Sequence, residues 1–189
     1  MSPTCRALIS ITSASATLFD CKETTGLFIS EAMHPYKVLR AAGFEVDLAS
    51  EAGTYTPDWL SQQPGFPNGD DLATWNNADS EFRKKLDNMP KASDLDGSKY
   101  GLFYASAGHA ALIDYPTATS LQKIAERVWV SSEVGIPRWS KKLLLVLAQP
   151  RAPGIWNDFH IVDGRLVTGQ NPTSAESTAR ATVAVFETL

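Results

Sequence analysis

The chain has 189 residues, a formal net charge of −4 and an apolar content of 43%. This length suits one globular domain with a sizeable core, so we expect a single domain over residues 1–189. The net charge is negative and no run of Lys or Arg is longer than two residues, so the sequence has no basic cluster of the kind that binds nucleic acid or an anionic membrane. We therefore expect a small-molecule or protein partner.

Targeting signals and metal-binding patterns are also missing from the sequence. No apolar run approaches membrane-spanning length and the N-terminus does not resemble a signal peptide, so a cytoplasmic location is the default expectation. The two cysteines, Cys5 and Cys21, are expected to be thiols rather than a disulfide. The histidines at 34, 109 and 160 lie far apart, so we expect neither a metal nor a cofactor.

The first predicted elements are a strand and a helix. Residues 6–11 form an apolar run typical of a buried strand. A Ser- and Thr-rich loop follows, and Thr24 or Thr25 can cap a helix that ends at Gly43. Pro35 lies inside this helix and cannot donate to the carbonyl of Glu31, so the helix should kink or loosen there.

The middle of the chain predicts a second strand, a long loop and a second helix. Residues 44–49 alternate between apolar and polar side chains, as a strand does. Residues 50–73 are rich in Pro and Gly without a sustained period, which indicates a long loop or lid. Residues 75–86 have a helical pattern that Pro90 stops.

The stretch that organises the chain is an apolar run followed by a turn of small residues. Tyr100 to Ala105 reads as a central strand buried on both faces, and Ser106 to His109 follows at once. Ligands of open parallel sheets bind just outside the carboxyl ends of the strands, so we expect the functional site at this turn. Small residues there can aim backbone N–H groups at a developing oxyanion. Pro116 is expected to open a helix that runs to about Val128.

The remaining elements include one ambiguous segment. Lys142 to Ala148 is either a buried strand or part of a helix, because periodicity cannot separate the two over seven residues. Two alternating runs on either side of Asp163-Gly164 predict a β-hairpin. Thr173 to Glu176 matches a capping box and opens a final helix that should pack on the sheet.

Several motifs together resemble one known family. Ser106-Ala-Gly-His109 followed by Asp114-Tyr-Pro116 is similar to the Gly-Gly-His-Gly and Asp-Phe-Pro signature of the ThiJ/PfpI superfamily, in its chaperone-like, glutathione-independent glyoxalase III branch. The other matching motifs are Thr25-Gly-Leu-Phe28, Glu31, His34-Pro35, Gly43 to Asp47, Trp156 to Phe159, and Asp163 to Pro172. The resemblance covers residues 6–128 and 151–189.

The resemblance implies a fold and shows what this chain lacks. The expected fold is an α/β, flavodoxin-like three-layer sandwich with a mostly parallel sheet, its central segment partly deleted. In the family a cysteine on a strained strand-to-helix elbow supplies the nucleophile, and here residues 130–137 stand where the sequence should read through that elbow. A few dozen residues are missing ahead of Trp156. Residues 142–148 are the only spare apolar run able to fill the gap in the sheet.

Site residues follow from the same resemblance. Glu31 and His109 are expected as catalytic residues, with Ala107, Gly108 and Trp156 binding substrate. Without the resemblance, Glu31 would read as a solvent-facing helix residue and His109 as a polar turn residue, while Trp156 could equally be a packing anchor. Asp114 is expected to cap the helix after Pro116, and His34 to be structural.

Two functions stay open at this point. One is a glyoxalase III-like lyase of the D-lactate dehydratase type that acts on methylglyoxal or a related small aldehyde, impaired because the nucleophilic cysteine is missing. The other is a non-catalytic holdase-like or interaction protein, or a truncated gene product of such an enzyme. A dimer with an intact paralogue is one form of the non-catalytic function, and a homodimer is a further option for the chain.

Overall fold

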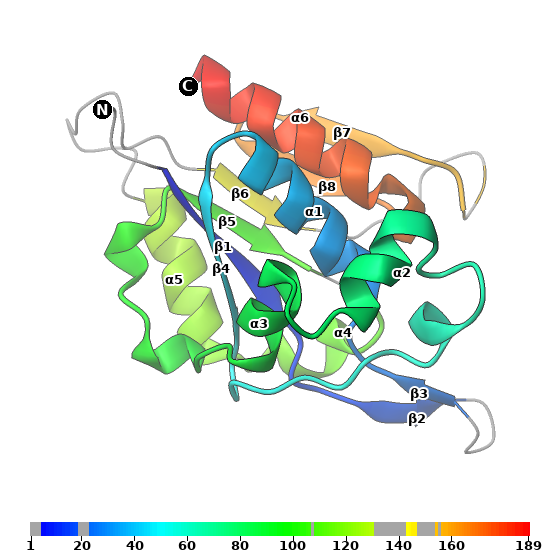
Figure 1. The fold of residues 1–189 in the computed structure, drawn as a ribbon. Coiled ribbons are helices and arrows are strands. Elements are labelled where there is room, and N and C mark those ends of the chain that lie inside the picture. Colours follow the sequence, from blue (N-terminus) through cyan, green and yellow to red (C-terminus); the bar gives the residue numbers. More distant parts are fainter. Residues whose placement is uncertain (1–4, 19–22, 107, 131–142, 147–153, 155) are drawn as a thin grey trace.

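The computed structural model describes residues 5–18, 23–106, 108–130, 143–146, 154 and 156–189. These residues form three layers (Figure 1). A six-stranded sheet lies in the middle, α1 (Ile29–Ala41) and α6 (Ala175–Thr188) cover one face, and α5 (Thr119–Val130) covers the other. The predicted α/β sandwich is confirmed.

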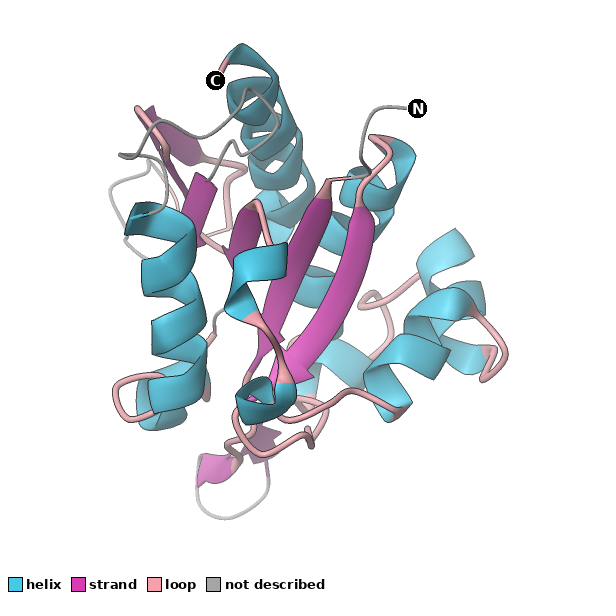
Figure 2. Cartoon of the chain, turned by 90° about the vertical axis from the view of Figure 1, so that its left-hand side faces the viewer, coloured by secondary structure: helices cyan, strands magenta, loops and turns pink. Residues whose placement is uncertain are grey.

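The sheet is mostly parallel, as expected. Its spatial order is β4-β1-β5-β6-β8-β7, and only β7 runs antiparallel to its neighbour. The strands are twisted relative to one another, as a view from the α5 side shows (Figure 2). A separate antiparallel pair, β2 with β3, lies beyond the sheet. The strands are β1 (Arg6–Ile11), β2 (Ala16–Leu18), β3 (Glu23–Thr25), β4 (Glu45–Ser50), β5 (Leu102–Ala105), β6 (Leu143–Val146), β7 (His160–Asp163) and β8 (Leu166–Gly169).

Alternation along the strands divides the interior into two cores. In β5, Leu102 and Tyr104 pack with the α1 and α6 side chains, whereas Phe103 and Ala105 pack with α5. β1 alternates in the same way, with Leu8 on the α5 side. Because helices cover both faces, the central strands are apolar at nearly every position.

The first helix begins later than predicted. α1 starts at Ile29 after Phe28, and neither Thr24 nor Thr25 caps it. Both threonines instead lie in β3 and pair with residues of β2. The predicted end at Gly43 is confirmed, because this glycine has a φ of 87° and its N–H bonds to the Arg40 carbonyl.

The helix predicted over residues 75–86 is two helices, α2 (Gly69–Asn76) and α3 (Glu81–Asp87). A turn separates them, since the side chain of Asn77 accepts from the N–H of Asp79 and Ser80 caps α3 by accepting from Arg83. α2 also occupies the end of the predicted 50–73 loop. The rest of that loop holds one short 3-10 turn, Leu60–Gln62, and further 3-10 turns lie at Ala92–Asp94, Gly97–Lys99 and Pro172–Ser174.

The helix expected from Pro116 begins at Thr119 instead. A short helix, α4 (Ala111–Asp114), precedes it, and Pro116 lies in the turn between the two. The N–H groups of Ser120 and Leu121 donate to the carboxylate of Glu51, which lies just after β4 and so caps the N-terminus of α5. Sequence spacing cannot reveal such a distant cap.

Near the C-terminus two boundaries shift slightly. The predicted hairpin is present, but Asp163 pairs with Leu166, so the two-residue connection is Gly164-Arg165 rather than Asp163-Gly164. The capping box is formed by Asn171 with Ser174, not by the predicted Thr173 to Glu176 pair. The final helix packs on the sheet as expected, through side chains such as Ala179 and Phe186.

The ambiguous 142–148 segment contains a strand. β6 lies between β5 and β8 and is parallel to both. It therefore takes a central place in the sheet, where the resemblance requires a strand. Residues 131–142, which include most of the stretch expected to replace the elbow, lie outside the described residues.

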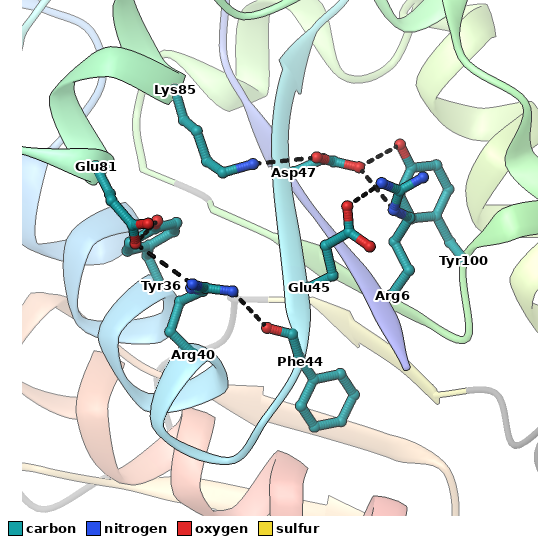
Figure 3. A network of polar contacts seen from close by, with 9 residues as sticks. All are labelled: Arg6, Tyr36, Arg40, Phe44, Glu45, Asp47, Glu81, Lys85 and Tyr100. Carbon is teal, nitrogen blue, oxygen red and sulfur yellow. Dashed lines mark hydrogen bonds and ion pairs between the residues drawn. The ribbon is translucent and has the colours of Figure 1, made fainter. Parts of the chain in front are cut away.

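A polar network ties the amino end of the sheet together (Figure 3). Asp47 accepts from Tyr100 at 3.1 Å and forms ion pairs with Arg6 at 3.3 Å and Lys85 at 3.4 Å. Arg6 also pairs with Glu45. These contacts lie at the opposite edge from the predicted site and are structural. No helix in the described ranges is both long and apolar enough to cross a membrane.

Candidate active site at the carboxyl edge of the sheet

The carboxyl ends of the parallel strands β1 and β5 meet at one edge of the sheet. The pairing of these strands continues past β5, where the N–H of Ser106 donates to the carbonyl of Ser10 at 3.1 Å. The turn that begins at Ser106 is therefore fixed to the end of β1. Ligands of this kind of sheet bind at such an edge.

The segment before α1 holds the acidic residue Asp58 at this edge. At Gly26 a Cβ would stand 2.1 Å from the carbonyl oxygen of Thr56, so only glycine allows this approach. Leu27 then exchanges backbone hydrogen bonds with this segment, donating to Thr56 and accepting from Asp58, both at 2.8 Å. Asp58 is thereby held close enough for its charge to act on Glu31.

Glu31 lies in the first turn of α1 and is 4% exposed. Burial, and then the negative charge of Asp58, raise the pKa of Glu31 from 4.5 to about 8. A helix N-terminus favours a carboxylate by about 0.3–1 kcal/mol, which is too little to offset full desolvation. Glu31 is therefore mostly protonated at neutral pH and can both donate and accept a proton near pH 8.

The 106–109 turn lies directly beside this carboxyl group. An ideal Cβ at Gly108 would stand 3.2 Å from Oε2 of Glu31. The predicted proximity of Glu31 to the turn is confirmed. His109 is exposed, and its ring makes no hydrogen bond to another described residue. Ala107 lies outside the described residues, so its predicted role stays a prediction.

Two further buried hydroxyls belong to the same strand end. Tyr104 and Ser106 are both 0% exposed, and neither hydroxyl has a hydrogen-bond partner among the described residues. Burial, together with the charge of Glu31, raises the pKa of Tyr104 well above its ordinary value. The phenol of Tyr104 therefore lies within electrostatic reach of the Glu31 carboxyl.

Asp114 and Tyr115 clamp the turn to the end of β1. The Asp114 carboxylate accepts from the Thr12 hydroxyl at 2.9 Å and from the N–H groups of Ser13 at 2.7 Å and Ala14 at 3.2 Å. The Tyr115 hydroxyl donates to the carbonyl of Ser106 at 2.7 Å. The predicted helix-capping role of Asp114 is wrong, because its carboxylate is occupied by the loop after β1.

Trp156 is linked to the start of α1 through aromatic side chains. It is 49% exposed, and its ring centroid lies 6.2 Å from that of Phe66. Phe66 in turn packs edge-on against Phe28, at 5.6 Å. Trp156 is therefore linked to Phe28, the residue before α1, only through Phe66, and its predicted role in substrate binding stays a prediction.

The described residues supply no thiol at this edge. Cys5 directly precedes β1, at the opposite end of the strand from the turn. Cys21 lies outside the described residues. Across the described ranges no three His, Cys, Asp or Glu side chains are grouped so as to hold a metal ion. His34 bonds to Asp71 at 2.6 Å, in keeping with a structural role.

Sequence patterns missed two of these groups. Asp58 lies in a segment without periodicity, and only the tertiary contact of Leu27 with residues 56–58 brings it to Glu31. Tyr104 reads as an ordinary core residue of an apolar strand. A tyrosine in such a strand does carry one polar group that needs a partner, which is the signal that could have drawn attention to it.

Comparison with known proteins identifies the family. The chain is 35% identical to glyoxalase 3 of Candida albicans over an alignment of 234 residues that spans 96% of this chain and 98% of the relative. A glutathione-independent glyoxalase of Saccharomyces cerevisiae is 31% identical, with 92% and 94% covered. The chain belongs to the glutathione-independent glyoxalase (glyoxalase III) family of the ThiJ/PfpI superfamily. No family model matches it.

Solved structures agree with this family assignment. The crystal structure of glyoxalase III from Candida albicans superposes with a TM-score of 0.87 at 31% identity, over 98% of both chains. A DJ-1β of Drosophila melanogaster, at 11% identity and a TM-score of 0.57, shows the shared fold alone. The 234-residue alignment with the Candida glyoxalase is longer than this 189-residue chain, so the relative carries residues that have no counterpart here.

Proposed function

We propose that this chain is a glyoxalase III-like lyase of the D-lactate dehydratase type, acting on methylglyoxal or a related small aldehyde, with turnover impaired by the missing thiol. The observation that carries the proposal is the buried carboxyl of Glu31, with a pKa of about 8, beside the Gly108 turn. The relatives that match along nearly the whole chain are named glyoxalases. The proposed setting is the cytoplasm, with a homodimer as a further option.

The chemistry assigns Glu31 the proton transfers. In the reaction that the family resemblance implies, a thiolate adds to the aldehyde carbon and a glutamate moves a proton from that carbon to its neighbour. Water then cleaves the resulting thioester, which releases D-lactate and frees the thiol. A carboxyl group with a pKa near 8 can accept the proton and return it. Backbone N–H groups of the turn would support the oxyanion. Without the thiol, the covalent adduct that divides the barrier into two steps is lost.

The test is D-lactate formation from methylglyoxal without glutathione, measured beside glyoxalase 3 of Candida albicans. We expect only a remnant of activity, since sites that lose a nucleophile retain about 10³–10⁴-fold over water through binding and oxyanion support. Glu31→Gln should remove that remnant. Turnover equal to that of the Candida enzyme would contradict the impairment, and a remnant insensitive to Glu31→Gln would contradict the assigned role.

A second function is favoured by exposed apolar side chains beside the site. Leu112 and Ile113, in α4 just after His109, are 74% and 52% exposed. A surface of this kind suits a holdase-like or interaction protein. Light scattering of a heat-denatured client protein tests this reading. We expect suppression of aggregation that Leu112→Ser with Ile113→Ser abolishes, and no suppression by the unsubstituted chain would remove this alternative.

A truncated gene product is the remaining alternative. Sequencing the transcript across the codons for residues 125–155 distinguishes it from a true deletion. A transcript that encodes a cysteine elbow in this interval would identify the chain as a shortened form of an ordinary enzyme. A transcript that matches the chain as printed would establish that the family member itself lacks the elbow.

A further inference from the structure

The two edge strands of the sheet differ in how well they are covered. β4 forms one edge and most of its residues are buried. β7 forms the other edge, pairs with β8 on its inner side, and is exposed along its whole length. Its two apolar residues, Ile161 and Val162, are 46% and 47% exposed. Neighbouring residues of a strand point to opposite faces, so β7 is open to solvent on both faces.

The outer side of β7 presents the backbone groups of two residues. The N–H of Gln170 donates to the carbonyl of Phe159 at 3.1 Å, at the start of the ladder between β7 and β8. In an antiparallel pair only every second residue bonds to the neighbouring strand, so the residues next to these face outward. The N–H and carbonyl groups of His160 and Val162 therefore point away from β8, and none of them bonds to another described residue.

β7 also lacks the common features that prevent strands from pairing at an edge. Such edges often carry Lys or Pro, or a bulge that turns the strand away. β7 reads His-Ile-Val-Asp, without Lys or Pro, and its register with β8 is continuous from His160 to Asp163. A row of unpaired backbone groups with apolar residues at its centre is a template for one more strand.

A second copy of β7 complements this edge. A two-fold axis perpendicular to the sheet sets the two copies antiparallel and keeps the same face of each copy on the same side. With the axis at Ile161, His160 of each copy lies opposite Val162 of the other, so the outward N–H and carbonyl groups meet. Ile161 then faces its own copy in the closely spaced, non-hydrogen-bonded pair. The two Asp163 carboxylates lie at opposite ends of the joint ladder, so like charges do not meet.

We propose that two copies of this chain associate through β7, about a two-fold axis at Ile161, and so join their sheets into one. An axis at Val162 is less favourable, because it would place Ile161 opposite the charged Asp163. A four-residue edge is small beside the standard protein interface of about 1,600 Å², so the dimer is weak and forms as the protein concentration rises. The inference goes beyond the proposed function and does not depend on turnover.

The first test is disulfide cross-linking by oxidised glutathione. Ile161→Cys and Val162→Cys are each made in a chain that also carries Cys5→Ala and Cys21→Ala. Ile161→Cys should form a covalent dimer at least about tenfold faster, because opposed Cβ atoms lie about 4.5–5.5 Å apart and diagonal positions about 7–8 Å apart. Val162→Cys is the matched control, since the two side chains are equally exposed on the same strand.

The second test is sedimentation equilibrium of the full chain over a range of concentrations. Ile161→Lys should weaken self-association at least about tenfold, because it sets two like charges directly opposite each other. Ile113→Lys is the matched control, since Ile113 is similarly exposed but lies in α4, and it should leave association unchanged.

Three results would overturn the inference. They are a chain that stays monomeric up to about 1 mM, equal cross-linking of the two cysteine variants, or association that Ile161→Lys leaves unchanged. Association lost only in Ile113→Lys would place the contact on α4 instead. A monomer that binds an extended segment of a client protein along β7 would show that a client, and not a second copy, occupies the edge.

Discussion

Gly108 lies against the carboxyl group of Glu31, because an ideal Cβ at position 108 would stand 3.2 Å from Oε2. The same glycine has a φ of 125°, a conformation that L side chains rarely adopt. A side chain at position 108 would therefore be strained by this backbone conformation and would require the Glu31 carboxyl to shift by a few tenths of an ångström. A residue far away in the sequence thus sets how tightly the Glu31 carboxyl is enclosed.

Gly108→Ala should destabilise the fold through both backbone strain and contact with Glu31. We expect a loss of about 2 kcal/mol in the free energy of unfolding, measured with urea. Gly43→Ala is the matched control, because Gly43 also has a positive φ, 87°, but its Cβ would meet nothing within 4 Å. Equal losses for the two variants would show that the contact with Glu31 costs nothing.

Asp114→Ala should release the loop after β1 from the turn. The variant leaves the N–H groups of Ser13 and Ala14 and the Thr12 hydroxyl without their acceptor, so we expect a loss of about 2 kcal/mol. Hydrogen exchange of the Ser13 and Ala14 amides should accelerate in parallel. Asp96→Ala serves as the comparison, since the Asp96 carboxylate accepts from its near neighbour Ser98 and binds no loop from another part of the described chain. Unchanged amide protection in Asp114→Ala would contradict the clamp.

Cys21→Ala should leave any residual D-lactate formation unchanged. Cys5 lies at the wrong end of β1, so Cys21 is the one other thiol in the sequence that could replace the missing nucleophile. Its sole cationic neighbour in sequence is Lys22, which gives little reason to expect an activated thiolate. Cys5→Ala provides the control. Loss of turnover in Cys21→Ala but not in Cys5→Ala would identify Cys21 as a substitute nucleophile.

The sequence predicted the layers and the sheet well because those follow from local patterns. The buried runs at residues 6–11 and 100–105 contain β1 and β5, and the two-strand pattern around Gly164 contains β7 and β8. The position of the candidate site was predicted from one rule, that small residues after a buried parallel strand lie at the ligand-binding edge. Those features need no knowledge of distant contacts.

Where the predictions were wrong, a distant contact had replaced a local one. Thr24 and Thr25 pair in β3 instead of capping α1. Asp114 binds the loop after β1 instead of capping α5, and Glu51, just after β4, caps that helix. Sequence spacing describes only residues that are close in the chain. The hydrogen-bond partners of side chains that could cap a helix or bind a nearby backbone group are therefore predicted least reliably. The same limit hid Asp58, whose effect on Glu31 arises only in the folded chain.

Glu31→Gln should change how stability depends on pH. The pKa of Glu31 is about 8 in the folded chain against 4.5 as the ordinary value, so between these values the folded state binds more protons than the unfolded state. The stabilising effect of this group is thus fully present below about pH 4.5 and is lost as the pH rises toward 8, by up to about 1.4 kcal/mol per pH unit. Glutamine cannot ionise, so the stability of Glu31→Gln relative to the unsubstituted chain should grow across this range and level off above it.

Asp58→Asn removes the second cause of the raised Glu31 pKa, so the loss of stability with rising pH should be complete at a lower pH in this variant. Urea unfolding between about pH 5 and pH 9 measures all three chains, and parallel curves would show that the Glu31 carboxyl is not enclosed as described.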